Sequence, residues 1–259
     1  LIEAPLDLTP RSNTDFWAGQ LEAEVLPTGT LRRTGGGHIA ELPGFAEGTW
    51  WVQDAAAMLP VRLLGDITGK RVADLCAAPG GKTLQLCAAG AAVTAVDISA
   101  RRMIRVGENL ARAGLAAELV TADASKWTPE AKFDAVLLDA PCSGTGTLRR
   151  HPDIAWLKDE EDVGRLTLTQ DRLLLHAVDL LKPGGMLVYA VCSLQEDEGL
   201  ARIEALLARE PRLKRMPVQP AELPGLENAA TKDGDVRTLP SMWPERGGLD
   251  GFYIARLSF

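Results

Sequence analysis

Long hydrophobic runs are missing from the sequence. No apolar stretch approaches the roughly 18 residues that a membrane-spanning helix needs. The start, L-I-E-A-P-L-D, also lacks the basic and apolar regions of a signal peptide. We therefore expect a soluble, cytoplasmic protein. The first residue is Leu1 rather than methionine, as in a processed product or a fragment.

Cysteine and histidine are scarce. The 259 residues include four cysteines and three histidines, and no C-x-x-C spacing occurs. Zinc sites rely on such spacings, so we expect no metal site. Disulfides are rare in the cytoplasm, so the cysteines are predicted to be free thiols.

An excess of positive charge is missing too. The net charge of −7 argues against a protein that coats nucleic acid by bulk electrostatics. Local basic patches remain compatible with this charge, because some of the 28 lysines and arginines are clustered. Guanidinium groups suit phosphates, although a solvated surface explains any one cluster equally well. The clusters are Arg32–Arg33, Arg101–Arg102 with Arg105, Arg149–Arg150, and Arg212 with Lys214–Arg215.

After Arg71 the sequence alternates regularly between strand and helix patterns. Helices are predicted from residue 83, over 99–113 with Ser99 as the cap and Gly114 as the stop, over 160–181 and over 196–209. Such alternation predicts an α/β fold with a doubly wound, mostly parallel, seven-stranded sheet. The strands are expected at 72–76, 92–97, 118–121, 133–139, 187–191, 213–218 and 251–257.

Residues 1–66 lack this rhythm. Glycine and proline clusters between short apolar pieces indicate short strands and turns. One short helix is predicted over 53–64, interrupted by Pro60. The chain is therefore predicted to consist of a small N-terminal α+β extension, residues 1–66, and the α/β domain, residues 67–259.

Cys192 directly follows the buried strand pattern Leu187–Val191. Ligands of open parallel sheets bind outside the carboxyl ends of the strands, so Cys192 is a candidate for chemistry. A small cysteine packed as a hydrophobe is the alternative. Asp139 and Cys142 follow the preceding strand. Two free thiols at the ends of neighbouring strands favour a reactive pair.

A glycine-rich loop follows the first strand of the α/β domain. Its sequence, A-A-P-G-G-K-T, matches neither the dinucleotide fingerprint G-x-G-x-x-G nor the phosphate loop. Asp97 ends the second strand, where a carboxylate can accept hydrogen bonds from ribose hydroxyls; nicotinamide and S-adenosyl-L-methionine binders share this feature. Asp123 ends the third strand and could accept from an adenine amino group or serve only a turn.

These motifs resemble the RNA cytosine-C5 methyltransferases of the Fmu/Sun type, which include bacterial 16S ribosomal RNA enzymes. The resemblance covers the chain from about Pro43 to its end. The D-A-P-C block with a distal C-S is specific, whereas the glycine loop alone is not. The matching segments are D-L-C-A-A-P-G-G-K-T (74–83), V-D-I-S (96–99), D-A-P-C-S-G-T-G-T-L-R-R-H-P-D-I-A-W (139–156), L-K-P-G-G (181–185), Y-A-V-C-S (189–193) and D-G-F-Y-I-A-R-L (250–257).

The resemblance implies a Rossmann-like methyltransferase domain over residues 67–259, with residues 1–66 as a candidate RNA-binding subdomain. It implies Cys192 as the nucleophile, Cys142 as the group that assists product release, and Asp139 beside them. Two departures are Val191 in place of threonine and Gln195–Glu198 in place of a proline–glutamate–glutamate–asparagine run. The residues implied to hold S-adenosyl-L-methionine are Cys76, Ala77, Ala78, Pro79, Gly80, Gly81, Lys82, Asp97, Asp123 and Asp139.

The chemistry of this family explains the two thiols. C5 of cytosine is too electron-poor to attack a sulfonium methyl, so a thiolate first adds at C6 and makes C5 nucleophilic. The thiol, with an ordinary pKa of about 8.5, must be activated. Asp139 can hydrogen-bond the N3 and N4 edge of a cytosine that has been unstacked. Arg149, Arg150 and His151 are candidates for RNA phosphates, although a local cap explains His151 equally well.

Several alternatives stay open. DNA cytosine-C5 methyltransferases use a proline–cysteine dipeptide as the nucleophile, which here would be Cys142. Other classes are a non-catalytic RNA-binding protein of ribosome assembly, a small-molecule methyltransferase, and a nicotinamide oxidoreductase, whose G-x-G-x-x-G is absent. We expect RNA as the partner, ribosomal RNA before transfer RNA, and a monomer.

Overall fold

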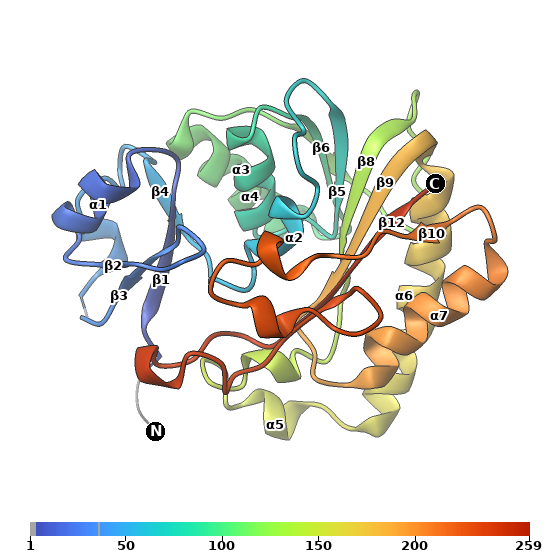
Figure 1. The fold of residues 1–259 in the computed structure, drawn as a ribbon. Coiled ribbons are helices and arrows are strands. Elements are labelled where there is room, and N and C mark those ends of the chain that lie inside the picture. The colour runs from blue at the N-terminus through green and yellow to red at the C-terminus, as the bar shows by residue number, and fades with distance from the viewer. Residues whose placement is uncertain (1–3, 36) are drawn as a thin grey trace.

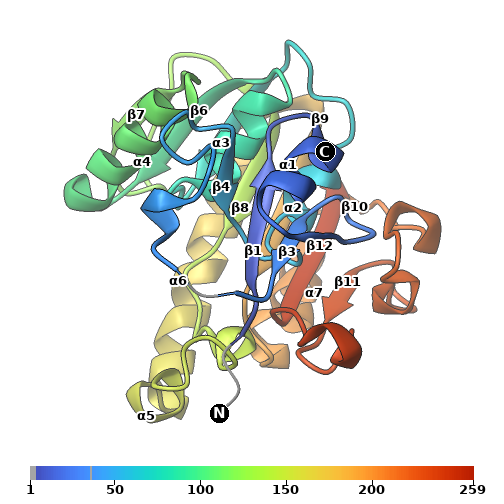
Figure 2. The ribbon, with the colours of Figure 1, turned by 90° about the vertical axis from the view of Figure 1, so that its left-hand side faces the viewer.

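Two β-sheets organise the chain in the computed structural model, which describes residues 4–35 and 37–259. The smaller sheet is antiparallel and has the order β2-β3-β1-β4. Helix α1 (Thr14–Gln20) follows β1. Figures 1 and 2 show this sheet, in blue, beside the larger one. Its strands are β1 (Leu6–Pro10), β2 (Glu24–Val25), β3 (Leu31–Arg33) and β4 (Trp50–Val52).

The larger sheet confirms the predicted α/β fold. Its order is β10-β12-β9-β8-β5-β6-β7, with β11 paired to β12. Five neighbouring strands of this order, β9, β8, β5, β6 and β7, run parallel to one another. Strand β12 is antiparallel to β9. Its strands are β5 (Arg71–Leu75), β6 (Ala92–Asp97), β7 (Glu118–Thr121), β8 (Phe133–Asp139), β9 (Leu181–Val191), β10 (Lys214–Arg215), β11 (Val236–Thr238) and β12 (Phe252–Ser258).

This sheet has eight strands instead of the predicted seven. The additional strand, β11, is three residues long, too short for an alternating pattern to be recognised. It exists because it pairs with β12, whose position is set by the tertiary structure. Strand β9 also begins at Leu181, earlier than expected, while the predicted strand at 213–218 is reduced to Lys214–Arg215.

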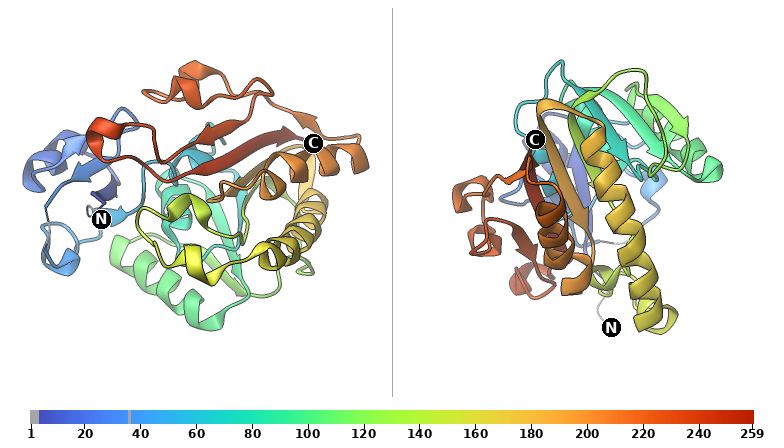
Figure 3. Two further views of the ribbon diagram at one scale, coloured as in Figure 1. Left: turned by 90° about the horizontal axis from the view of Figure 1, so that it is seen from below. Right: turned by 90° about the vertical axis from the view of Figure 1, so that its right-hand side faces the viewer.

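Helices cover both faces of the large sheet. On one face, α6 (Glu160–Asp179) and α7 (Leu200–Arg209) bury Leu173, Ala177 and Ile203 against the strands. On the other face lie α2 (Leu59–Arg62), α3 (Gly81–Ala88) and α4 (Ala100–Ala113). Figure 3 shows α6, in yellow, running along the sheet. None of the helices in the described ranges is long and apolar enough to cross a membrane.

Sequence signals at the helix ends are confirmed for α4. The Ser99 hydroxyl accepts a hydrogen bond from the Arg102 N–H at 3.3 Å, and Gly114 takes the left-handed conformation with φ of 59°. Helix α6 begins at Glu160 as predicted, behind a capping box formed by Asp159 and Asp162.

Two helix predictions need correction. The helix expected over 53–64 is only α2, where Pro60 occupies the first turn and therefore starts the helix instead of interrupting it. The helix expected over 196–209 is divided into the 3₁₀ turn η3 (Glu196–Glu198) and α7, with Gly199 between them. Gly199 packs against the ring of Tyr253, where an added Cβ would lie 2.8 Å from the ring. The division at residue 66, between α2 and β5, stays a prediction, as does an RNA-binding role for residues 1–66.

Candidate active site

The predicted site residues meet at one edge of the large sheet. Parallel strands end at the same edge, and the register pairs Leu75 with both Val96 and Leu138, and Asp139 with Ala190. The loops that follow β5, β6, β8 and β9 therefore converge. They carry the glycine-rich loop, Asp97, the D-A-P-C segment and Cys192, respectively.

The sulfur atoms of Cys142 and Cys192 lie 3.4 Å apart. Both side chains are partly buried, and all four cysteines are free thiols. Strand β9 positions Cys192 because it is paired on both sides, with β8 and β12. The carbonyl of Cys192 accepts a hydrogen bond from the Gly146 N–H at 3.0 Å, which joins the two cysteine-bearing loops. The structure therefore brings the two predicted thiols together, while their catalytic roles stay predictions.

The two thiols have opposite pKa shifts. A hydrogen bond from the Cys142 thiol lowers the pKa of Cys192; Lys82 acts in the same direction, whereas burial and Asp139 oppose it. The same contact raises the pKa of Cys142 well above its ordinary value, and burial and Glu198 add to this rise. The hydrogen bond between the two sulfurs is the largest cause of both pKa shifts, and it favours the thiolate on Cys192.

Lys82 belongs to the reacting edge as well as to the glycine-rich loop. Its ammonium Nζ lies 2.7 Å from Asp139 Oδ2 and 5.3 Å from the centre of the Phe252 ring. Burial acts to lower the pKa of Lys82, but Asp139 outweighs it and the pKa is raised. Sequence reasoning assigned Lys82 only to cofactor binding, and its ion pair with Asp139 is seen only in the structure.

A cavity of about 580 Å³ adjoins these residues. Its volume is in the range of small-molecule sites. It is lined by Cys76, Asp97, Asp123, Pro141 and residues of α6, among others. At the loop that leads to it, Gly80 has φ of 105°, and a Cβ there would lie 3.2 Å from Val106. A glycine is therefore required in this loop.

The carboxylates of the cavity suit S-adenosylmethionine. Asp97 accepts hydrogen bonds from the Ala78 N–H at 3.2 Å and the Ser99 N–H at 2.9 Å, one on each oxygen. Oδ2 also lies 3.6 Å from Arg102 Nη1, so Oδ1 is the oxygen with a lone pair left that could accept from a ribose hydroxyl. One oxygen of Asp123 forms the local turn with Ser125, at 3.0 Å to N and 2.7 Å to Oγ. The other oxygen lies 3.5 Å from the Lys126 ammonium, and its role as an acceptor for an adenine amino group stays a prediction.

Asp74 is a residue at this edge to which sequence reasoning assigned no role. It is fully buried, and its Oδ2 accepts a hydrogen bond from the Thr83 hydroxyl at 2.5 Å. Burial raises its pKa to about 7. Asp74 thus ties β5 to α3 beneath the glycine-rich loop. The only sequence feature that could have indicated this structural role is the position of Asp74 at the start of the D-L-C-A motif.

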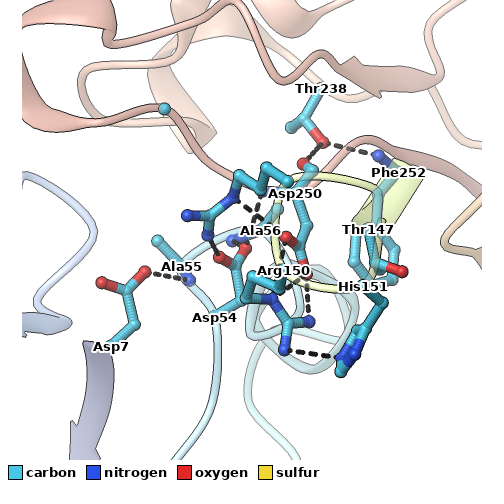
Figure 4. A network of polar contacts seen from close by, with 12 residues as sticks. Asp7, Asp54, Ala55, Ala56, Thr147, Arg150, His151, Thr238, Asp250 and Phe252 are labelled. Atoms are coloured by element: carbon cyan, nitrogen blue, oxygen red, sulfur yellow. Dashed lines mark hydrogen bonds and ion pairs between the residues drawn. The ribbon is translucent and has the colours of Figure 1, made fainter. Parts of the chain in front are cut away.

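The structure changes the interpretation of Arg149 and Arg150. Both were expected to contact RNA phosphates, but both guanidinium groups are engaged by buried carboxylates. Arg149 pairs with Asp54 and Asp250, and Arg150 pairs with Asp250. Figure 4 shows this network between the N-terminal part and the segment before β12. These arginines hold the loop after β8 in position.

His151 lies at the end of the same network. Its backbone N–H donates to the Thr147 carbonyl at 2.9 Å, and its exposed ring lies 3.4 Å from the Arg150 guanidinium. Neither contact decides between the local cap and the RNA-phosphate contact expected for His151, so both stay predictions. In the described part of the chain, no cluster of three or more histidine, cysteine or acidic side chains could hold a metal ion.

The fold and the cofactor cavity together define a class, the S-adenosylmethionine-dependent methyltransferases with a Rossmann-like sheet. A family model described as 16S rRNA methyltransferase RsmB/F matches residues 61–258. The chain therefore belongs to the RsmB/F family, and the predicted resemblance to Fmu/Sun-type enzymes is confirmed.

Known relatives agree with this assignment. Ribosomal RNA small subunit methyltransferase B of Klebsiella pneumoniae is 44% identical over 224 residues, which cover 85% of this chain and 49% of the relative. The enzyme of the same name from Pseudomonas syringae is also 44% identical, over 225 residues, with the same coverage. The chain thus spans about half the length of these relatives.

Solved structures show the same architecture. A methyltransferase homolog from Pyrococcus horikoshii aligns with a TM-score of 0.80 at 25% identity, covering 98% of this chain and 86% of that protein. NSun6 from Pyrococcus horikoshii, solved with SFG, aligns with a TM-score of 0.72 at 26% identity, covering 86% and 56%. SFG is an analogue of S-adenosylmethionine, which supports the predicted cofactor.

Proposed function

We propose that this chain transfers a methyl group from S-adenosylmethionine to C5 of a cytosine in RNA, with small-subunit ribosomal RNA as the first candidate. The observation that carries the proposal is the pair of cysteine sulfurs 3.4 Å apart. Pro141, which precedes Cys142, lines the proposed cofactor cavity, which supports a place for the methyl donor next to the pair. Membership of the RsmB/F family supports RNA as the substrate.

Cys192 is the proposed nucleophile. Its pKa is lowered, so a larger fraction is thiolate at neutral pH than for an ordinary cysteine. The thiolate adds to C6 of the cytosine, and C5 becomes electron-rich. When bound, S-adenosylmethionine would supply the electrophilic methyl group to C5, and S-adenosylhomocysteine would be the leaving group. Covalent addition in this way divides one difficult step into two easier ones.

Asp139 and Lys82 are proposed to recognise the base. A carboxylate beside an ammonium group, 2.7 Å apart, presents one acceptor and one donor. Cytosine matches this pair with its donating amino group on C4 and its accepting N3. Uracil has an acceptor and a donor in the reverse positions, so both contacts would be lost.

Cys142 is proposed to act after methyl transfer. Its pKa is raised while the neighbouring sulfur is a thiolate. Once Cys192 is bonded to C6 it carries no charge, so a thiolate on Cys142 becomes less unfavourable. The Cys142 thiol then releases its proton to water, and the resulting thiolate accepts the proton from C5. Loss of that proton forms the C5–C6 double bond and breaks the C6–sulfur bond. Cys192 leaves as the thiolate and 5-methylcytosine is released.

Substitution of each cysteine tests the assignment of roles. We expect Cys192→Ala to abolish both methyl transfer and covalent capture of RNA. We expect Cys142→Ala to retain capture and to accumulate a protein–RNA adduct, because the release step is lost. The measurement is transfer of a labelled methyl group to 16S rRNA, combined with denaturing gels that detect the adduct.

The opposite result would assign the nucleophile to Cys142, as in DNA cytosine-C5 methyltransferases. If the wild-type protein binds RNA without any methyl transfer, a non-catalytic role in ribosome assembly replaces our proposal. Mapping 5-methylcytosine in cellular RNA with and without this gene then distinguishes ribosomal RNA from transfer RNA. Free cytidine serves as the control for a small-molecule methyltransferase.

A further inference from the structure

A buried glutamate connects the two cysteine-bearing loops. Glu198 is fully buried in the 3₁₀ turn η3. Its Oε1 accepts hydrogen bonds from the Ser143 N–H at 2.8 Å and from Gln170 Nε2 at 3.1 Å. Its Oε2 accepts from the hydroxyls of Ser143 and Ser193, both at 2.5 Å. The carboxylate is thus bound by four donors, all of them neutral.

The partners of Glu198 are placed next to the reactive residues in the chain. Ser143 directly follows Cys142, and Ser193 directly follows Cys192. The two serine hydroxyls also lie 3.1 Å from each other. We propose that Glu198 is a positioning residue that sets the distance between Cys142 and Cys192.

The two cysteines depend on Glu198 to different degrees. Cys192 follows β9, a central strand paired on both sides, so the sheet itself holds it. Cys142 lies in a loop that side chains hold by hydrogen bonds. Gln170 donates to the carbonyl of the preceding Pro141 at 2.9 Å, and Glu198 accepts from the N–H of the following Ser143. Loss of Glu198 should therefore displace Cys142 more than Cys192.

This asymmetry leads to a specific kinetic expectation, which rests on the proposed function. Attack by Cys192 on C6 should survive the loss of Glu198, whereas release assisted by Cys142 should be impaired. Removing a buried carboxylate also leaves four donors without their acceptor, which costs stability. The two effects differ in their readout, because instability lowers every step together.

The test compares Glu198→Ala with Cys142→Ala and with Glu196→Gln, a matched control in the same turn whose side chain is exposed. For Glu198→Ala we expect an adduct to accumulate on 16S rRNA. Turnover should fall by roughly 10- to 100-fold, as when a reacting group is misplaced by about 1 Å. Capture by RNA that contains 5-fluorocytosine reports attack and methyl transfer but not release, because C5 then carries no proton to remove. It should stay close to wild type.

Glu198→Gln keeps the shape of the side chain and one carbonyl acceptor, so it should restore part of the turnover and reduce the adduct. Ser143→Ala removes a single hydroxyl donor and serves as the milder variant if Glu198→Ala does not fold. It should show a smaller accumulation of the same kind. Diamide oxidation gives a readout independent of turnover: the disulfide between Cys142 and Cys192 should form more slowly in the Glu198 variants.

Two results would overturn the inference. One is a parallel loss of 5-fluorocytosine capture and turnover in the Glu198 and Ser143 variants, in step with lower melting temperatures. The other is unchanged turnover and unchanged disulfide formation. If Cys142→Ala itself traps no adduct, the proposed function fails and the kinetic part of this inference fails with it. A trapped adduct in Cys142→Ala but not in Glu198→Ala rejects the role of Glu198 alone.

Discussion

Single residues of ordinary type acquire unusual properties at the edge of the large sheet. Cys192 and Cys142 are the same residue type, yet the pKa of one is lowered and that of the other is raised. The difference comes first from the hydrogen bond between the two sulfurs, to which Lys82 adds for Cys192 and Glu198 for Cys142. The pKa of each thiol, and with it the reactivity of the site, therefore depends on the presence of the other thiol.

Asp74 allows a test of burial at the residue scale. Its pKa is raised to about 7 from 3.8, so the folded state holds a proton that the unfolded state releases near pH 4. The free energy of unfolding should fall as pH rises from about 4 to 7, by up to ~4 kcal/mol. Asp74→Asn cannot titrate, and its stability should vary less with pH.

The measurement is urea unfolding of both proteins at pH 5 and pH 8. The quantity that matters is the difference in slope, because all other titrating groups are shared. Equal pH dependence in the wild type and Asp74→Asn would show that Asp74 is ionised across this range in the folded state.

Elements meet closely where the loop after β8 crosses the segment before β12. Gly146 donates to the Cys192 carbonyl at 3.0 Å, and its own carbonyl accepts from the Gly251 N–H at 2.8 Å. A Cβ at Gly146 would lie 1.9 Å from the Gly251 carbonyl oxygen. The position of Cys142 thus depends on a crossing that only glycine permits.

Gly146→Ala should therefore lower the free energy of unfolding by at least ~2 kcal/mol, because backbone must move to admit the methyl group. Gly164→Ala is the matched control: Gly164 lies in α6 with no atom within 4 Å of the added Cβ. It should raise stability by about 0.5–1 kcal/mol, since alanine favours the helix. Chemical denaturation checks both values, and a neutral Gly146→Ala would contradict the close crossing.

Across the whole molecule, buried charges join segments that are far apart in the sequence. Arg32 pairs with Asp7 at 2.7 Å and donates to the Gly248 carbonyl at 2.6 Å. Arg149 bridges Asp54 and Asp250 in the same region. Both links connect the N-terminal part to the segment before β12. The N-terminal part therefore supports the loop after β8.

Arg149→Ala should be severely destabilising, by about 3–5 kcal/mol, because it leaves the buried Asp54 carboxylate without its cation and Asp250 with Arg150 alone. Arg105→Ala, on the exposed face of α4, should change stability by no more than about 0.5 kcal/mol. Thermal or urea unfolding checks both. The salt dependence of RNA binding by folded Arg149→Ala should match wild type; a shallower dependence would return Arg149 to the phosphate-contacting role first expected.

Much of this protein was predictable from the sequence alone. The strand at 92–97, the strand at 133–139 and the capped helix that follows Ser99 agree with the structure, because each depends on local signals. The family followed from the D-A-P-C and C-S motifs, and these also located the two thiols. The predicted strand ends also indicated that these residues meet at one edge of the sheet, because parallel strands end at the same edge.

Only the tertiary structure decided how distant residues pair. Nothing near Glu198 in the sequence indicates that it binds the residues after both cysteines, and nothing near Arg149 indicates Asp54 and Asp250. Such pairings follow from which loops the sheet order brings together, and that order is a property of the whole chain. The sequence thus determined the reacting groups, while the fold determined which buried side chains hold them and which arginines are already engaged.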